Sequence, residues 1–150
     1  MEKNNYLSIY AKSFNWAGFF LPKKTYSKCS NLYDFCRTLD NIADDGGETE
    51  IKLRRFLNFK DNFKNQEFQN PIIKNMWELM DEYNISKNIV YDLFDGVESD
   101  IQNKVKLNSK KELLIYSYRV AGTVGLMMAK ILNVTSSNSL KSAIDLGIAM

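Results

Sequence analysis

The sequence contains no histidine, and only two cysteines, two prolines and seven glycines among its 150 residues. Without histidine and with few thiols, a metal ion would have to be held by oxygen ligands such as carboxylates. Cys29 and Cys36 lie seven residues apart, which on one helix is a separation of about 10 Å. Because a disulfide tolerates a Cα separation of only about 7 Å, we expect reduced thiols in a cytoplasmic protein.

Long apolar runs and a strong net charge are also missing. The opening residues MEKNNYLSIY contain no long apolar segment, and no stretch reaches the roughly 20 apolar residues that a membrane span needs. The net charge of +2 gives no case for nucleic acid as a partner. Peripheral contact with the inner face of a membrane stays open, because a lysine cluster would favour an anionic surface, although a solvated basic loop is the alternative. The cluster consists of Lys104, Lys106, Lys110 and Lys111.

The composition and periodicity that are present indicate a single helical domain. A hydrophobic fraction of 45% with 13% aromatics excludes a disordered chain, and the length suffices for one core. Sparse proline and glycine leave long segments, and no segment alternates at period two, so the fold class is predicted to be all-α. Helices are expected at about residues 5–21, 22–45 and 71–83, and further ones begin at about 49, after Ser86 and at 137 or 139. The apolar face of the helix from 49 would consist of Ile51, Leu53, Phe56, Leu57 and Phe63. A helix at 109–134 would open with a capping box at Ser109 and Glu112.

Residues 31–47, NLYDFCRTLDNIADDGG, form the centre of the prediction because they read as one helix with two different faces. At about 100° per residue, the apolar residues of the stretch gather on one side: Leu32, Phe35, Leu39, Ile42 and Ala43. The other side carries Tyr33, Arg37, Asp40 and Asp44. Gly46 and Gly47 are expected to end the helix in the left-handed conformation.

The two acids on the polar face call for a compensating positive charge. Asp40 and Asp44 lie one turn apart and would repel each other by a few tenths of a kcal/mol in a bare helix. Arg37 is one candidate partner, and a divalent cation is another. Oxygen ligands suit Mg²⁺, which commonly bridges one or two carboxylates to a phosphate, and Arg37 would be a bidentate phosphate donor. A solvated acidic face with an Arg–Asp pair within the helix remains the alternative.

A second informative stretch is 116–128, YSYRVAGTVGLMM. Glycine inside an apolar helix costs about 1 kcal/mol relative to alanine, so close approach to the backbone should offset that cost. The small residues Ala121, Gly122 and Gly125 leave room either for another helix or for a ligand. The first alternative is tight helix packing, and the second is the floor of an apolar channel with Tyr116 at its edge, one turn before Val120.

Taken together, these stretches resemble the squalene/phytoene synthase family over nearly the whole chain. The matching segments are AKSFNWAGFFLPKKTY (11–26), LYDFCRTLDNIADD (32–45), DGVESD (95–100), YSYRVAGTVGLMM (116–128) and AIDLGIAM (143–150). Three features depart from the family pattern. Ala11 stands where the family often has serine, Lys106 where many members have arginine, and the chain ends at Met150, where the family continues into a second aspartate-rich motif.

The resemblance implies an all-α isoprenoid (terpenoid) synthase fold, of which residues 1–150 would be the N-terminal part of a single domain. Such an incomplete helical bundle would expose faces that a whole domain buries. We therefore expect these residues alone to be inactive and prone to aggregate.

The resemblance also implies the head-to-head condensation of two prenyl diphosphates, two molecules of geranylgeranyl diphosphate giving phytoene through prephytoene diphosphate, as in carotenoid biosynthesis. Asp40 and Asp44 would hold Mg²⁺, or Mn²⁺, that bridges to the diphosphate, and Arg37 and Ser13 would contact its oxygens. The metal would stabilise charge on the leaving diphosphate. The substrate cavity would be lined by Phe14, Tyr33, Tyr116, Val120, Ala121 and Gly125.

Three alternatives stay open at this point. A squalene or dehydrosqualene synthase would use farnesyl diphosphate, and squalene formation would also need NADPH, which phytoene synthesis does not. No nucleotide-binding glycine motif is visible in these residues. A non-catalytic assembly factor of the same family would be expected to have lost the paired acids, and a plain helical interaction module leaves the shared face of Arg37, Asp40 and Asp44 unexplained.

Overall fold

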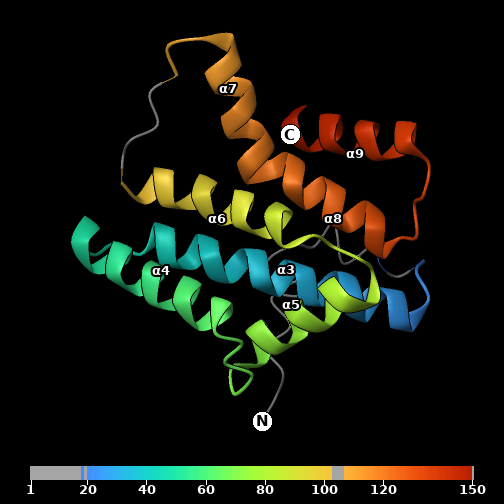
Figure 1. Ribbon diagram of the computed structural model, residues 1–150, viewed down its shortest axis with the longest axis horizontal. Helices are drawn as coiled ribbons and strands as arrows, with labels where there is room; N and C mark the ends of the chain where they lie inside the picture. The colour runs from blue at the N-terminus through green and yellow to red at the C-terminus, as the bar shows by residue number, and fades with distance from the viewer. Residues whose placement is uncertain (1–17, 19, 103–106, 150) are drawn as a thin grey trace.

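The computed structural model describes residue 18, residues 20–102 and residues 107–149, and within them it contains helices and turns but no strand (Figure 1). The all-α prediction is therefore confirmed. In chain order the helices are α3 (Lys23–Asp44), α4 (Thr49–Lys64), α5 (Pro71–Glu82), α6 (Lys87–Ile101), α7 (Lys110–Ser117), the π-helix η1 (Tyr118–Gly122), α8 (Thr123–Ile131) and α9 (Ser137–Ala149). The helix expected at 5–21 lies almost wholly outside the described residues.

At the starts of α5, α6 and α7, which lie where the sequence predicts, local side chains satisfy the first backbone N–H groups. The Asn70 side chain accepts the backbone N–H of Ile72 at 2.9 Å and opens α5. Ser86 caps α6 in the same manner. At α7 the Ser109 hydroxyl accepts the backbone N–H of Glu112 at 3.2 Å, so the serine half of the predicted capping box is confirmed.

The end of α3 corrects the prediction for the two glycines. Neither Gly46 nor Gly47 has a positive φ, and the chain leaves the helix at Asp45 with φ −55° and ψ 132°. The Lys52 ammonium group, from α4, donates instead to the backbone carbonyl of Ala43 at 3.1 Å. A side chain of the next helix therefore satisfies a terminal carbonyl that a left-handed glycine would otherwise help to cap.

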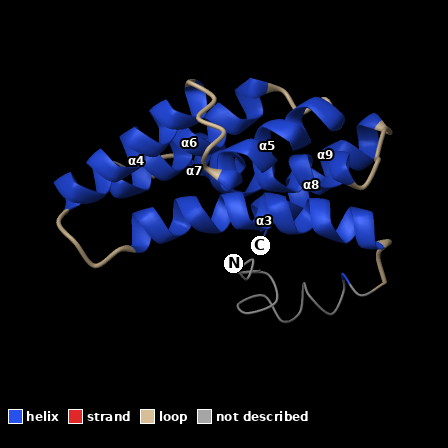
Figure 2. Ribbon diagram, turned by 90° about the horizontal axis from the view of Figure 1, so that it is seen from below, coloured by secondary structure: helices blue, strands red, loops and turns tan. Residues whose placement is uncertain are grey.

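Helix α3 is the element around which the others pack. It contacts α4, α5, α6 and α8, and in Figure 1 it runs beside α4 and α6 through the middle of the bundle. Figure 2, seen from below, shows α3 along one edge with the other helices on one side of it. This position explains why α3 has a buried apolar face and a separate polar face.

A cluster of phenylalanine rings forms the centre of the core. Phe35 of α3 lies 5.6 Å from the ring centroid of Phe63 on α4 and 5.8 Å from that of Phe94 on α6. The predicted apolar face of α3 is confirmed, since Leu32, Phe35 and Leu39 are fully buried. Aromatic pairs at such distances stabilise a core beyond the area that they bury, so three helices are held together at one point.

The apolar face predicted for α4 is partly wrong. Ile51 and Leu57 were expected in the core, but they are 37% and 40% exposed. The buried face consists of Phe56, Phe59 and Phe63, which are spaced three and four residues apart as a helix face requires. Ile51 and Leu57 lie outside this stripe, and their apolar character alone did not reveal which side of α4 meets α6.

The helix predicted at 109–134 is interrupted by η1, a π-helical turn at residues 118–122. Here the chain crosses α6 at Gly96, where an added Cβ would lie 2.8 Å from Cγ1 of Val120 and 3.0 Å from Cβ of Arg119. The extra residue of a π-turn changes which side chains face α6. The crossing therefore combines a glycine on one helix with a widened turn on the other.

The outer helices α7 and α9 contain no buried residue. On α7, Leu113, Leu114 and Ile115 are 45%, 45% and 44% exposed, and on α9 Leu146 is 63% exposed. The tendency to aggregate that such surfaces suggest stays a prediction. In the described part of the chain, no helix combines the length and apolar character needed to cross a membrane.

Candidate active site

Three carboxylates from two helices line one cavity of about 290 Å³. Asp40 and Asp44 come from the polar face of α3, and Asp100 comes from the last turn of α6. The remaining wall is mixed, with one cation and several apolar side chains. It includes Thr49, Lys52, Val97, Ile101 and Val120. The cavity therefore combines clustered negative charge with an apolar side.

Burial and three neighbouring charges act on the carboxyl group of Asp40. Burial raises the pKa of its carboxyl group above the usual value, the Arg37 charge opposes this rise, and the carboxylates of Asp44 and Asp100 reinforce it. The guanidinium group of Arg37 therefore only partly offsets the negative charge. An unbalanced cluster of this kind favours a cation at the cavity.

Asp100 is hydrogen-bonded to a tyrosine that the sequence had singled out. The Tyr116 hydroxyl donates to Oδ1 of Asp100 at 2.8 Å. Burial raises the pKa of Asp100, the Tyr116 hydrogen bond lowers it, and Asp44 raises it further. Burial, together with the hydrogen bond and charge of Asp100, raises the pKa of Tyr116 to about 12. The phenol is therefore held in its protonated, donating form.

Asp100 was not among the site residues predicted from the sequence, although its segment DGVESD belongs to the stretches that carry the family resemblance. The available signal was the spacing of Gly96 and Asp100, one helical turn apart on α6. Gly96 permits the close crossing with η1, and Asp100 then lies beside the carboxylates of α3. Only the packing of α6 against α3 brings the third acid to the first two.

The donor set fits a magnesium ion that a ligand helps to coordinate. Within the described ranges, no three histidine, cysteine or acidic side chains are close enough to form a complete metal centre. Mg²⁺ ordinarily keeps several waters and is held by one or two carboxylates together with phosphate oxygens. Asp40 and Asp44 provide such a pair of oxygen donors, and the cavity wall contains no histidine or cysteine.

The other predicted residues divide into three groups. Arg37 and Tyr33 are half-buried on α3, and neither is among the residues that line the 290 Å³ cavity. Val120 does line it. Ser13 and Phe14 lie outside the described residues, so their predicted contacts with substrate stay predictions.

The small residues of the second stretch face helix α9. A Cβ added at Gly125 would lie 2.3 Å from the carbonyl oxygen of Ala143, and one added at Gly147 would lie 2.6 Å from that of Ala121. Of the two alternatives, helix packing is therefore what the structure shows at Gly125. A contact of Ala121 or Gly125 with substrate stays a prediction.

The two cysteines are free thiols in the structure. Burial, reinforced by the Asp40 charge, raises the pKa of Cys36 to about 12, and burial also raises the pKa of Cys29. Because the thiolate is the reactive form, neither thiol is a candidate nucleophile.

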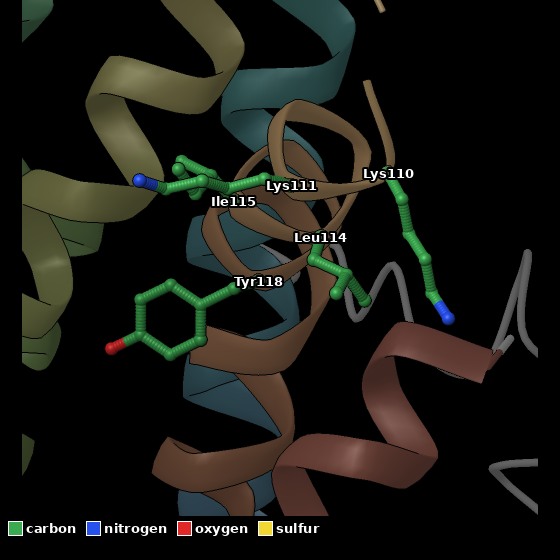
Figure 3. Close-up of a pocket in the computed structure, with 5 residues that line it drawn as sticks. All are labelled: Lys110, Lys111, Leu114, Ile115 and Tyr118. Carbon is green, nitrogen blue, oxygen red and sulfur yellow. The ribbon is translucent and has the colours of Figure 1, made fainter.

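A second hollow of about 480 Å³ lies on the surface of α7. Figure 3 shows that its lining comes from one helical segment, with the Lys110 and Lys111 side chains extending in different directions. Leu114, Ile115 and Tyr118 complete the lining, and none of the five residues carries a carboxylate. The hollow therefore lacks the acid groups that distinguish the first cavity.

Comparison with known proteins shows which family the chain belongs to. The family model described as squalene/phytoene synthase matches residues 7–150, and the chain belongs to this family. It is 30% identical over 152 residues to a phytoene synthase of Pseudescherichia vulneris, covering 93% of this chain and 48% of the relative.

Two further relatives carry other names. A 4,4'-diapophytoene synthase of Staphylococcus haemolyticus is 29% identical over 127 residues, covering 82% of this chain and 44% of the relative. A presqualene diphosphate synthase of Sinorhizobium fredii is 24% identical over 132 residues, covering 87% and 47%. The chain spans about half the length of these curated relatives.

Proposed function

We propose that the protein, at the full length of its relatives, condenses two prenyl diphosphates head to head. The observation that carries this proposal is the cavity at which Asp40, Asp44 and Asp100 meet beside the apolar Val120. A prenyl diphosphate likewise has one charged end and one apolar end. Its anionic diphosphate group requires a cation, and its prenyl chain requires an apolar surface. The names of the relatives, which include phytoene and presqualene diphosphate synthases, support the same reaction class.

Asp40 and Asp44 would hold Mg²⁺ at the diphosphate end of the substrate. Bound Mg²⁺ supplies charge stabilisation for the departing diphosphate. Arg37 lies close enough to Asp40 for its charge to act on that carboxyl group, and it would bind diphosphate oxygens through its guanidinium group. Tyr33 and Tyr116 would favour the allylic cation through their rings, while the apolar wall would exclude water that could quench it.

The substrate that we propose is geranylgeranyl diphosphate, and the product is phytoene, formed through prephytoene diphosphate without NADPH. The phytoene synthase relative supports this choice. Farnesyl diphosphate is the alternative substrate, supported by the names of the diapophytoene and presqualene diphosphate relatives. A non-catalytic assembly role is disfavoured because both acids of the α3 pair are present.

The experiment is a product assay with the purified full-length protein, Mg²⁺ and geranylgeranyl diphosphate in the absence of NADPH, followed by extraction and identification of the hydrocarbon. Phytoene is expected from the wild type and none from the Asp40→Ala variant. The matched control is Asp81→Ala, an exposed acid on α5 that does not line the cavity, and it should retain activity.

A parallel assay with farnesyl diphosphate, with and without NADPH, separates the alternatives. A C30 product would correct the substrate and keep the reaction class. Inactivity with both substrates would overturn the enzymatic proposal in favour of the assembly role.

We also propose peripheral contact with a membrane through α7. Lys110 and Lys111 lie beside the exposed apolar side chains of Leu114 and Ile115 on this helix. Basic and apolar groups on one surface are the combination that binds anionic lipid.

A further inference from the structure

The hydrogen bond between Tyr116 and Asp100 joins two helices at the edge of the candidate active site. The phenol comes from α7, and the carboxylate from the last turn of α6 lies 2.8 Å from its oxygen. Asp100 lines the cavity together with Asp40 and Asp44. The Tyr116 hydroxyl is therefore anchored on a group that belongs to the cavity wall.

A hydroxyl bound to a carboxylate makes one of the stronger hydrogen bonds in proteins. The Tyr116 hydroxyl donates its proton to the hydrogen bond with Asp100. This bond restricts rotation of the Tyr116 side chain. Tyr116 does not itself line the cavity, and it would act at the cavity edge as a fixed dipole and ring without donating a proton to the diphosphate. A ring in a fixed position can stabilise a developing cation without reorganising during the reaction.

The crossing of α6 and η1 sets the distance at which this pair can form. An added Cβ at Gly96 would meet Val120 at 2.8 Å, so a larger residue would push the two helices apart. Asp100 follows Gly96 by one turn on the same helix. Gly96 therefore allows α6 and η1 to approach closely, and Asp100, one turn later, accepts the hydrogen bond of Tyr116.

We propose that Asp100 is a positioning residue that acts through Tyr116, holding the phenol at the cavity edge for cation stabilisation. This inference rests on the proposed function, because it assigns a role within the prenyl diphosphate reaction. It predicts that Asp100 and Tyr116 contribute to kcat as a unit, with little effect on substrate KM.

The chain offers a matched control in a second tyrosine–aspartate pair. The Tyr118 side chain is hydrogen-bonded to Asp92, and this pair joins η1 to α6, next to the place where Tyr116 joins α7 to α6. Neither residue lines the 290 Å³ cavity. Asp92→Ala therefore removes a second tyrosine–aspartate link to α6 while leaving the cavity wall unchanged.

The kinetic experiment uses the full-length protein. Asp100→Ala is expected to lower kcat by roughly 10-fold to 100-fold, as loss of an outer-shell partner commonly does, whereas Asp100→Asn, which keeps an acceptor oxygen, should restore most of it. Combining Asp100→Ala with Tyr116→Phe should lower kcat little beyond Tyr116→Phe alone. Asp92→Ala should leave kcat unchanged. Wild-type kcat in Asp100→Ala, additive losses in the double variant, or an equal loss in Asp92→Ala would each overturn the proposal.

A second measurement does not depend on activity. Replacing Tyr116 by 3-fluorotyrosine gives a ¹⁹F resonance that reports its hydrogen bond, and this resonance should move in Asp100→Ala, move less in Asp100→Asn and stay in place in Asp92→Ala. An unchanged resonance in Asp100→Ala would overturn the positioning role. If the wild type is inactive while the resonance moves as expected, the proposed reaction fails but the Tyr116–Asp100 contact stands.

Discussion

Asp40 lies on the polar face of α3, away from the phenylalanine core. Its charged form is disfavoured by the neighbouring carboxylates of Asp44 and Asp100. Burial and the charges of Asp44 and Asp100 raise its pKa. A carboxyl group whose pKa is higher in the folded chain than in the unfolded chain binds more protons when folded. Its contribution to stability is therefore lost as the pH rises from the ordinary value of about 4 through the raised folded value.

We expect Asp40→Asn to raise the free energy of unfolding at neutral pH by a few tenths of a kcal/mol, because it removes like-charge repulsion at a partly solvated site. Below the ordinary carboxyl pKa the gain should disappear. Urea unfolding followed by circular dichroism at low salt measures the free energy of unfolding at neutral pH and at the acidic pH.

Asp81→Asn provides the control for this prediction, since Asp81 is exposed on α5 away from the cavity. It should leave the free energy of unfolding unchanged at both pH values. A less stable Asp40→Asn variant at neutral pH would contradict the view that the acids of α3 are retained at a cost to stability.

Helix α9 makes close backbone contacts with α8 and with η1, and each contact requires a glycine. At Gly125 an added Cβ would come within 2.3 Å of the Ala143 carbonyl oxygen, and at Gly147 within 2.6 Å of the Ala121 carbonyl oxygen. A methyl group at either position meets backbone atoms and no flexible side-chain end. Helix α9 would have to move away from α8 or η1 to accept it.

Gly125→Ala is therefore expected to lower the free energy of unfolding by about 1–2 kcal/mol. Overpacking of this kind commonly costs about 1–3 kcal/mol, and the better helix propensity of alanine returns up to about 1 kcal/mol. Thermal unfolding should show a decrease of a few degrees in Tm.

The control for Gly125→Ala is Gly46→Ala. Nothing lies within 4 Å of an added Cβ at Gly46, and its φ is not positive. The change should be neutral or stabilise the chain by up to about 1 kcal/mol. Equal stability of the Gly125→Ala and Gly46→Ala variants would show that α8 and α9 do not pack as closely as described.

The whole molecule has a well-filled centre and an apolar outer side. Phe35, Phe63 and Phe94 hold α3, α4 and α6 together, whereas α7 and α9 bury none of their residues. Two lysines accompany the exposed apolar side chains of α7. This outer side is the surface through which we propose contact with an anionic membrane.

We expect the protein to float with vesicles that contain phosphatidylglycerol and to remain unbound with phosphatidylcholine vesicles. Reversing the charge of Lys110 and Lys111 to glutamate should weaken binding at least about tenfold, because each lysine near an anionic surface contributes about 1 kcal/mol. The control reverses Lys23 and Lys64, which are exposed on α3 and α4, and should bind like the wild type.

Light scattering in the absence of vesicles distinguishes membrane binding from self-association of the protein. Large particles that form without lipid would indicate self-association through the apolar surface of α7 and α9. Equal binding of both charge-reversal variants would contradict a role for the α7 lysines and favour the interpretation of a solvated basic segment.

The sequence by itself determined the all-α class, the starts of most helices and the two faces of α3. These features depend on residues within one or two turns of each other. Ser109 caps α7 through a residue three positions away, and Leu32, Phe35 and Leu39 share a buried face because of the helical period. Local spacing carries enough information for features of this kind.

Only the tertiary structure decided which segments meet. The approach of Asp100 to Asp40 and Asp44, the packing of Gly125 on α9 and the use of Lys52 at the end of α3 join residues from different helices. The exposure of Ile51 and Leu57 could not be predicted from the sequence either. An apolar residue does not specify which neighbouring helix its face will contact. The physical reason is that helix packing depends on shape and burial summed over the whole chain, whereas caps and periodicity depend on near neighbours.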